Sequence, residues 1–92
     1  MHLYIDTSDP DKIKIKLGEK EFIAQSRKNK TQYLLEFIDE KISESGRQIG
    51  DVSKITINKG PGSFTGLRVG ATVASSLAWD LNIPVDIDLR LV

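Results

Sequence analysis

The feature that most constrains the fold of this chain is an alternation of lysine with isoleucine or leucine near its start. Residues 12–17 read Lys-Ile-Lys-Ile-Lys-Leu. Because successive side chains of a β-strand point to opposite faces, this spacing predicts a strand with one buried face and one solvent-exposed face. The apolar segment 3–8 precedes it across the turn Asp9-Pro10-Asp11, and Gly18 turns the chain into a further strand over 21–25. We therefore expect three antiparallel strands in a meander.

The spacing of apolar residues becomes helical after residue 29. The residues that recur at this spacing, and that are expected to face inward, are Leu34, Leu35, Ile38 and Ile42. Asn29 and Gln32 resemble an N-terminal capping box, and Gly46 provides the stop. The pattern predicts one helix between these limits.

A strand and a helix follow in the second half of the chain. Ile55-Thr56-Ile57 is a β-branched run within 52–58 that suits a buried strand. After a break at 60–63, helical spacing resumes, and Asn82 and Pro84 close that helix. The stripe of this helix that is expected to face the sheet consists of Gly66, Gly70, Val73, Leu77 and Leu81. Residues 83–87 are expected to form a last strand.

This order of elements, β-β-β-α-β-α-β, determines the expected fold class. It places a parallel strand pair behind an antiparallel meander, with right-handed helical crossovers. The prediction is an α/β fold with a mixed five-stranded sheet covered by helices. That is the ribonuclease-H-like lobe found in half of an actin-like ATPase or sugar-kinase fold.

Length and composition limit what the chain can be. Its 92 residues allow a single small domain over 1–92, whose modest core makes association with another chain an expectation. Thirteen basic and thirteen acidic side chains give no net charge, which argues against a dedicated nucleic-acid binder. The absence of cysteine excludes disulfides, thiolate metal sites and a cysteine nucleophile. The early charge at Asp6 and the lack of a long apolar run predict neither a signal peptide nor a membrane span, and we expect a cytoplasmic protein.

Few residues suggest chemistry. The segment 60–68, Gly-Pro-Gly-Ser-Phe-Thr-Gly-Leu-Arg, lies between a predicted strand and a helix N-terminus, where glycines can form an anion-binding concavity or can serve tight packing alone. It matches neither a Walker loop nor the dinucleotide fingerprint. The lone His2 has no ligand partner at a suitable spacing, and a turn explains Asp9 and Asp11 better than a carboxylate pair does. The sequence therefore offers no catalyst and no metal site of its own.

The complete sequence of this segment is more specific to one protein family than its glycines alone are. Residues 59–70 read Lys-Gly-Pro-Gly-Ser-Phe-Thr-Gly-Leu-Arg-Val-Gly, and Leu-Asn-Ile-Pro-Val follows at 81–85. This resembles the signature of the bacterial TsaB (YeaZ) family, the dimerisation subunit of the complex that makes threonylcarbamoyladenosine next to the anticodon of tRNA. Ile5-Asp6-Thr7-Ser8 and the segment 34–40 share the resemblance, which thus covers nearly the whole chain.

The resemblance implies a fold and a function. The chain corresponds to the N-terminal lobe of the family, and the second lobe is absent from it. It would act as a non-catalytic scaffold that pairs with a catalytic paralogue, binds a small ATPase subunit through that pair, and forms a homodimer when alone. ATP and metal would belong to the partner subunits, and tRNA would be contacted only indirectly.

The first phosphate loop of an actin-like ATPase corresponds to Asp6-Thr7-Ser8, where no glycine follows to admit phosphates. We therefore interpret Asp6, Gly60 and Gly62 as vestiges of a nucleotide site. On the first helix, Tyr33 and Phe37 are expected to be exposed and to form an apolar patch; the alternative is that they, with Trp79, cap the core of the domain itself. On the second helix, the face opposite the sheet is expected to contact the partner, through Arg68, Ala71, Ser75, Ala78 and Trp79.

Two alternatives from other functional classes remain open. One is a free-standing half ATPase or phosphotransferase that uses Asp6 and the glycine segment. The other is a small RNA-binding module that uses the lysines of 12–17. The missing glycine weighs against the first, and the charge balance weighs against the second.

Overall fold

The Lys-Ile alternation forms the second strand of a five-stranded sheet, whose order is β3-β2-β1-β4-β5. The computed structural model describes residues 1–25, 30–58 and 64–88. The strands are β1 (His2–Asp6), β2 (Lys12–Leu17), β3 (Lys20–Gln25), β4 (Lys54–Asn58) and β5 (Val85–Asp88). The helices are α1 (Lys30–Glu44), a short 3-10 turn η1 (Ile49–Asp51) and α2 (Phe64–Leu81).

Pairing in the sheet is mixed, as predicted. β1 pairs antiparallel with β2, and β2 pairs antiparallel with β3. β1 pairs parallel with β4, and β4 pairs parallel with β5. The meander, the parallel strands and the ribonuclease-H-like order are therefore confirmed.

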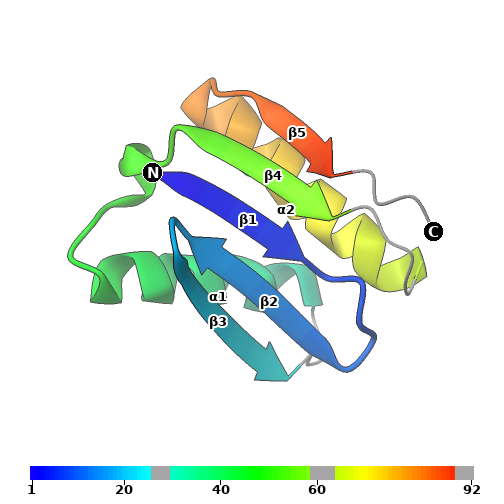
Figure 1. Cartoon of the computed structure of the whole chain (residues 1–92). Coiled ribbons are helices and arrows are strands. Elements are labelled where there is room, and N and C mark those ends of the chain that lie inside the picture. Colours follow the sequence, from blue (N-terminus) through cyan, green and yellow to red (C-terminus); the bar gives the residue numbers. More distant parts are fainter. Residues whose placement is uncertain (26–29, 59–63, 89–92) are drawn as a thin grey trace.

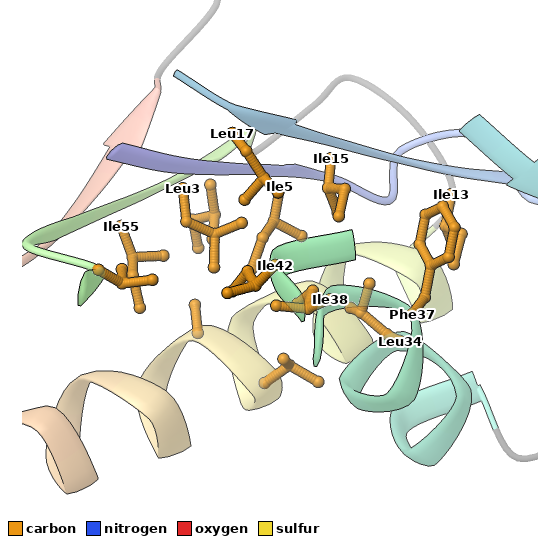
Figure 2. Close-up of a cluster of buried hydrophobic side chains, with 14 of the residues drawn as sticks. Leu3, Ile5, Ile13, Ile15, Leu17, Leu34, Phe37, Ile38, Ile42 and Ile55 are labelled. Atoms are coloured by element: carbon orange, nitrogen blue, oxygen red, sulfur yellow. The ribbon is translucent and has the colours of Figure 1, made fainter. Parts of the chain in front are cut away.

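Both long helices lie on the same side of the sheet (Figure 1). Figure 2 shows the core between the sheet and these helices, where side chains from β1, β2 and β4 meet those of α1. The fully buried side chains include Leu3, Ile5, Ile15, Leu34, Ile38, Ile42, Ile55 and Val73. In the alternating strand, Ile13, Ile15 and Leu17 are buried, while the lysines between them reach the other face of the sheet. The period-2 pattern therefore identified the buried face correctly.

The ends of the helices follow local signals. Gly46 has a positive φ of 77° after α1, and the Arg47 amide donates to the Ile42 carbonyl over 3.2 Å. Asn82 has a φ of 54° after α2, and the Ile83 amide donates to the Ala78 carbonyl over 3.1 Å. Both predicted stops are confirmed. Asn29, the expected cap of α1, lies outside the described residues.

Several strand boundaries differ from the prediction: β1 ends at Asp6 rather than at residue 8, and β3 begins at Lys20 rather than at residue 21. The expected strand over 52–58 begins at Lys54, because residues 49–51 form η1, in which the Gln48 amide donates to an Asp51 carboxylate oxygen over 2.8 Å. The last strand begins at Val85 rather than at residue 83, since Pro84 cannot donate a hydrogen bond to the ladder. Among the described residues, no helix is both long and apolar enough to cross a membrane.

Candidate functional site

The turn that follows β1 is organised around the carboxylate of Asp6. Asp6 Oδ1 accepts hydrogen bonds from the Ser8 amide (3.0 Å) and from Ser8 Oγ (2.6 Å). Burial by itself raises the pKa of this carboxyl group. The hydrogen bonds from Ser8 and Asn58 and the charge of Lys14 outweigh it, so that the pKa lies below its ordinary value. Asp6 is therefore ionised near neutral pH, and its charge holds the turn together.

Thr7 connects this turn to the second helix. Its side chain is buried, and Thr7 Oγ1 donates a 2.5 Å hydrogen bond to the carbonyl oxygen of Gly66 in the first turn of α2. One helical turn later, a Cβ placed on Gly70 would lie 2.5 Å from the same hydroxyl oxygen. The carboxyl end of β1 and the start of α2 thus touch at a point where only glycine fits.

The carboxyl ends of the parallel strands place polar residues side by side. Ile5 is paired with Ile57, so Asp6 lies next to Asn58, and Asn58 is paired in turn with Asp88. This edge is where open α/β sheets bind ligands. Within residues 1–25, 30–58 and 64–88, no three His, Asp or Glu side chains are grouped as a metal site would require. Gly60 and Gly62, the other suggested vestiges, lie outside the described residues.

Other polar residues singled out in the sequence have structural partners. Asp9 Oδ1 accepts a hydrogen bond from the Asp11 amide over 2.8 Å, which confirms the turn. His2 Nε2 lies 2.6 Å from Thr56 Oγ1, across the parallel pair. On the lysine-bearing face, Lys14 lies 3.9 Å from Glu21, and Lys16 lies over the ring of Tyr4.

The outward face of α2 agrees with the prediction at three of five positions. Arg68, Ser75 and Trp79 are exposed, and Trp79 is 86% exposed. Ala71 is half-buried and packs against the core. Ala78 was expected on this face but is buried, because it lies one helical turn after Ala74, a residue that also points into the core. The stripe of α2 that packs inward is therefore wider than the predicted stripe of glycine, valine and leucine residues, because it also includes alanines.

Two exposed positions on this side of α2, Thr72 and Ser76, were not predicted. Thr72 lies one turn after Arg68 and is exposed, so Arg68, Thr72, Ser75 and Trp79 form one outward row at about 100° per residue. We call this row the α2 ridge. The helical spacing of Thr72 relative to Arg68 and Ser75 could have identified it from the sequence.

The first helix is rotated relative to the prediction. Phe37, expected to be exposed, is only 5% exposed and belongs to the core, while Leu35, expected to face inward, is 36% exposed. Tyr33 is half-buried and stacks on Phe37 with 6.2 Å between ring centroids. The reason is how α1 packs on the sheet: it contacts β2, where Phe37 fills the space beside Ile13 (Figure 2), and Lys41 of α1 lies over the rings of both Phe37 and Phe22 of β3. Phe37 therefore cannot contribute an exposed patch.

A shallow cavity separates the beginnings of the two helices. It has a volume of about 250 Å³ and is lined by Thr31 of α1 and by Arg68, Val69 and Thr72 of α2. The cavity adjoins the α2 ridge at its Arg68 end. A side chain from another molecule can enter there and meet the guanidinium group.

The sequence is similar to several known proteins. A family model described as TsaD, tRNA N6-adenosine threonylcarbamoyltransferase, matches residues 23–86. The tRNA threonylcarbamoyladenosine biosynthesis protein TsaB of Bacillus subtilis is 38% identical over 65 residues, which are 71% of this chain and 28% of that protein. TsaB of Haemophilus influenzae is 41% identical over 69 residues, which are 74% of this chain and 29% of that protein.

A solved structure supports the same resemblance. The structure of YeaZ from Pseudomonas aeruginosa superposes with a TM-score of 0.77 at 27% identity, covering 98% of this chain and 44% of that one. The chain spans less than a third of the length of the two TsaB relatives.

Proposed function

Because the chain belongs to the TsaD family, whose matching relatives include TsaB biosynthesis proteins and threonylcarbamoyltransferases, we propose that it is a non-catalytic dimerisation subunit. In this proposal it serves the cytoplasmic machinery that forms threonylcarbamoyladenosine next to the anticodon of tRNA. It pairs with a catalytic paralogue of similar fold, forms a homodimer when that paralogue is absent, and works with a small ATPase subunit. ATP and metal are held by the partner subunits, and tRNA is contacted only indirectly.

The observation that carries the proposal is the α2 ridge. An indole group that is 86% exposed costs solvation free energy unless another molecule covers it. Tryptophan and arginine are the residue types most enriched at the energetic centres of interfaces. Between Arg68 and Trp79 the α2 ridge holds Thr72 and Ser75, whose small side chains let a second helix approach closely. Leu35 adds exposed apolar surface from α1.

The turn after β1 supports the non-catalytic part of the proposal. Asp6 Oδ1 is engaged by two groups of Ser8, and the Thr7 hydroxyl is engaged by the Gly66 carbonyl. Both residues thus have structural partners at the place where an actin-like ATPase admits phosphate. We interpret this turn as an element that fastens α2 to the sheet.

The proposal is tested by the mass of the chain in solution, alone and mixed with the catalytic paralogue from the same organism. Native mass spectrometry is expected to show a homodimer alone and a heterodimer in the mixture. Ser75→Arg is expected to abolish both species without changing the circular dichroism spectrum, because a large charge enters a close helix contact. Gln25→Arg, which adds the same charge on the exposed outer strand, is the matched control and should leave both intact.

A wild-type chain that stays monomeric in both samples would contradict the proposal. So would a Gln25→Arg variant that loses association as completely as Ser75→Arg.

A further inference from the structure

A second cavity lies at the amino end of β1, away from the turn that contains Asp6. It has a volume of about 390 Å³, and its lining includes Met1, Leu17, Lys20 and Arg47. These residues come from the start of the chain, from the end of β2, from the start of β3 and from the segment after α1. None of them belongs to the α2 ridge.

The floor of this cavity is apolar and fixed. Leu17 belongs to the core and is 7% exposed, and Met1 packs against that core. The Met1 carbonyl accepts a hydrogen bond from the Ser53 amide over 2.9 Å. Apolar surface in a fixed position favours an apolar part of a ligand, since no rearrangement has to accompany binding.

Backbone hydrogen bonds also hold the walls in place. The Gly18 amide donates to the His2 carbonyl over 3.0 Å, and Gly18 has a φ of 62° that keeps the β2–β3 turn tight. On the other wall, the Arg47 amide is fastened to the end of α1 by its bond to the Ile42 carbonyl. The backbone that carries Lys20 and Arg47 is therefore fixed before any ligand arrives.

The charge at this cavity is unbalanced. Lys20 and Arg47 are exposed, and within the described part of the chain neither forms an ion pair, whereas Lys14, Lys41 and Lys54 each do. Glu19 is the one carboxylate among the lining residues. An ammonium and a guanidinium group at one opening provide the charged donors that bind phosphate or carboxylate oxygens.

We propose that this cavity binds a small organic anion: a phosphate or carboxylate group on an apolar body. The anionic group contacts Lys20 and Arg47, and the apolar body lies over Met1 and Leu17. The volume is within the range of about 300 to 1,000 Å³ that is common for ligand pockets. This inference does not depend on the proposed function, because it uses none of the residues of the partner surface.

The test is to titrate the full 92-residue chain with phenyl phosphate or with benzoate. Binding is monitored by the chemical shifts of the backbone amides in NMR spectra. Saturable shifts at Leu17, Gly18 and Arg47 with either probe support the proposal, and the tighter probe identifies the anionic group. Arg47→Ala and Lys20→Ala should each weaken binding by about tenfold or more. Lys12→Ala, which removes an equal charge outside this cavity, is the matched control and should bind like the wild type.

A second pair of variants tests the electrostatics without removing a cation. Position 18 has a positive φ and open space around it, and both Asn and Asp tolerate that backbone conformation. Gly18→Asp should therefore bind more weakly than Gly18→Asn, since the two differ mainly in charge. The proposal is overturned if neither probe saturates, if inorganic phosphate binds as tightly as phenyl phosphate, or if Lys12→Ala weakens binding as much as Arg47→Ala does.

Discussion

The hydroxyl group of Thr7 occupies the space in which a side chain at position 70 would lie. A Cβ there would be 2.5 Å from Thr7 Oγ1, whose own position is fixed by its bond to Gly66. The glycine at position 70 is thus required by contact with the turn that follows β1, although its φ is not in the positive range that otherwise favours glycine. Gly66 and Gly70 were correctly predicted to face the sheet, but the sequence could not identify Thr7 as the residue they meet.

We predict that Gly70→Ala lowers the free energy of unfolding by about 1–2 kcal/mol, because the clash with Thr7 exceeds the helix propensity that alanine gains. Chemical denaturation measures the change. Gly50→Ala, at a position with no atom within 4 Å of the added Cβ, should stay within about 0.5 kcal/mol of wild type. In a Thr7→Ala background the effect of Gly70→Ala should shrink, and strict additivity would contradict the proposed contact.

The lowered pKa of Asp6 predicts a pH dependence of stability. A carboxyl group whose pKa is lower in the folded state stabilises the fold above its ordinary pKa, which is 3.8 here, and loses that contribution as the pH falls through the folded value. The free energy of unfolding, measured between pH 6 and pH 2.5, should therefore fall more steeply with decreasing pH for the wild type than for Asp6→Asn. Ser8→Ala should lie between the two, because it removes one of the hydrogen bonds that lower the pKa. Parallel curves for all three proteins would be inconsistent with this account.

At the scale of secondary structure, the two helices show what periodicity can and cannot predict. The inward residues Leu34, Ile38 and Ile42 and the stops at Gly46 and Asn82 depend on local spacing and local backbone conformation, and the sequence predicted them correctly. The rotation of α1 depends on which side chains of the sheet it meets. Phe37 packs beside β2, and Lys41 lies over the rings of Phe37 and of Phe22 on β3, so Phe37 is buried in the core and Leu35 is exposed.

The exposure of Trp79 on α2 gives a prediction that separates association from folding. Trp79→Ser should leave the free energy of unfolding of the monomer within about 0.5 kcal/mol of wild type, since the side chain contributes little to the core. It should weaken association with the partner by about 2 kcal/mol or more, as loss of an interface tryptophan does. Ile23→Ser on β3, which removes another exposed apolar side chain, is the control and should associate normally. An equal loss of association from Trp79→Ser and Ile23→Ser would instead indicate non-specific hydrophobic association.

For the whole molecule, the sequence predicted the element order, the mixed sheet and the buried face of the alternating strand. It could not predict the start of β4, because η1 depends on a local bond between Gln48 and Asp51 that no apolar pattern reveals. Gly60 and Gly62 lie outside the described residues, so their predicted roles stay predictions. The partner surface stays a prediction, in which the α2 ridge is the central part and Leu35 and Tyr33 of α1 add further accessible apolar surface.

The arrangement at the carboxyl edge predicts how the whole chain responds to nucleotide. Calorimetric titration with Mg-ATP should show no binding, because Asp6 and Thr7 are engaged within the fold and Thr7 and Ser8 fill the turn that glycine would open. Micromolar binding that Asp6→Ala abolishes would contradict this and favour the ATPase alternative.

The central position of β1 has a consequence for the time course of folding. β1 can pair with β2 as soon as the first hairpin has left the ribosome, but its other edge pairs with β4, and Ser53 contacts Met1 across 52 residues of chain. At a synthesis rate of about 5–20 residues per second, that edge stays unpaired for seconds, when it is open to mispairing with other chains. Pulsed hydrogen exchange should find amides of β2 and β3 protected before those of β4, and simultaneous protection would show that the meander does not form first.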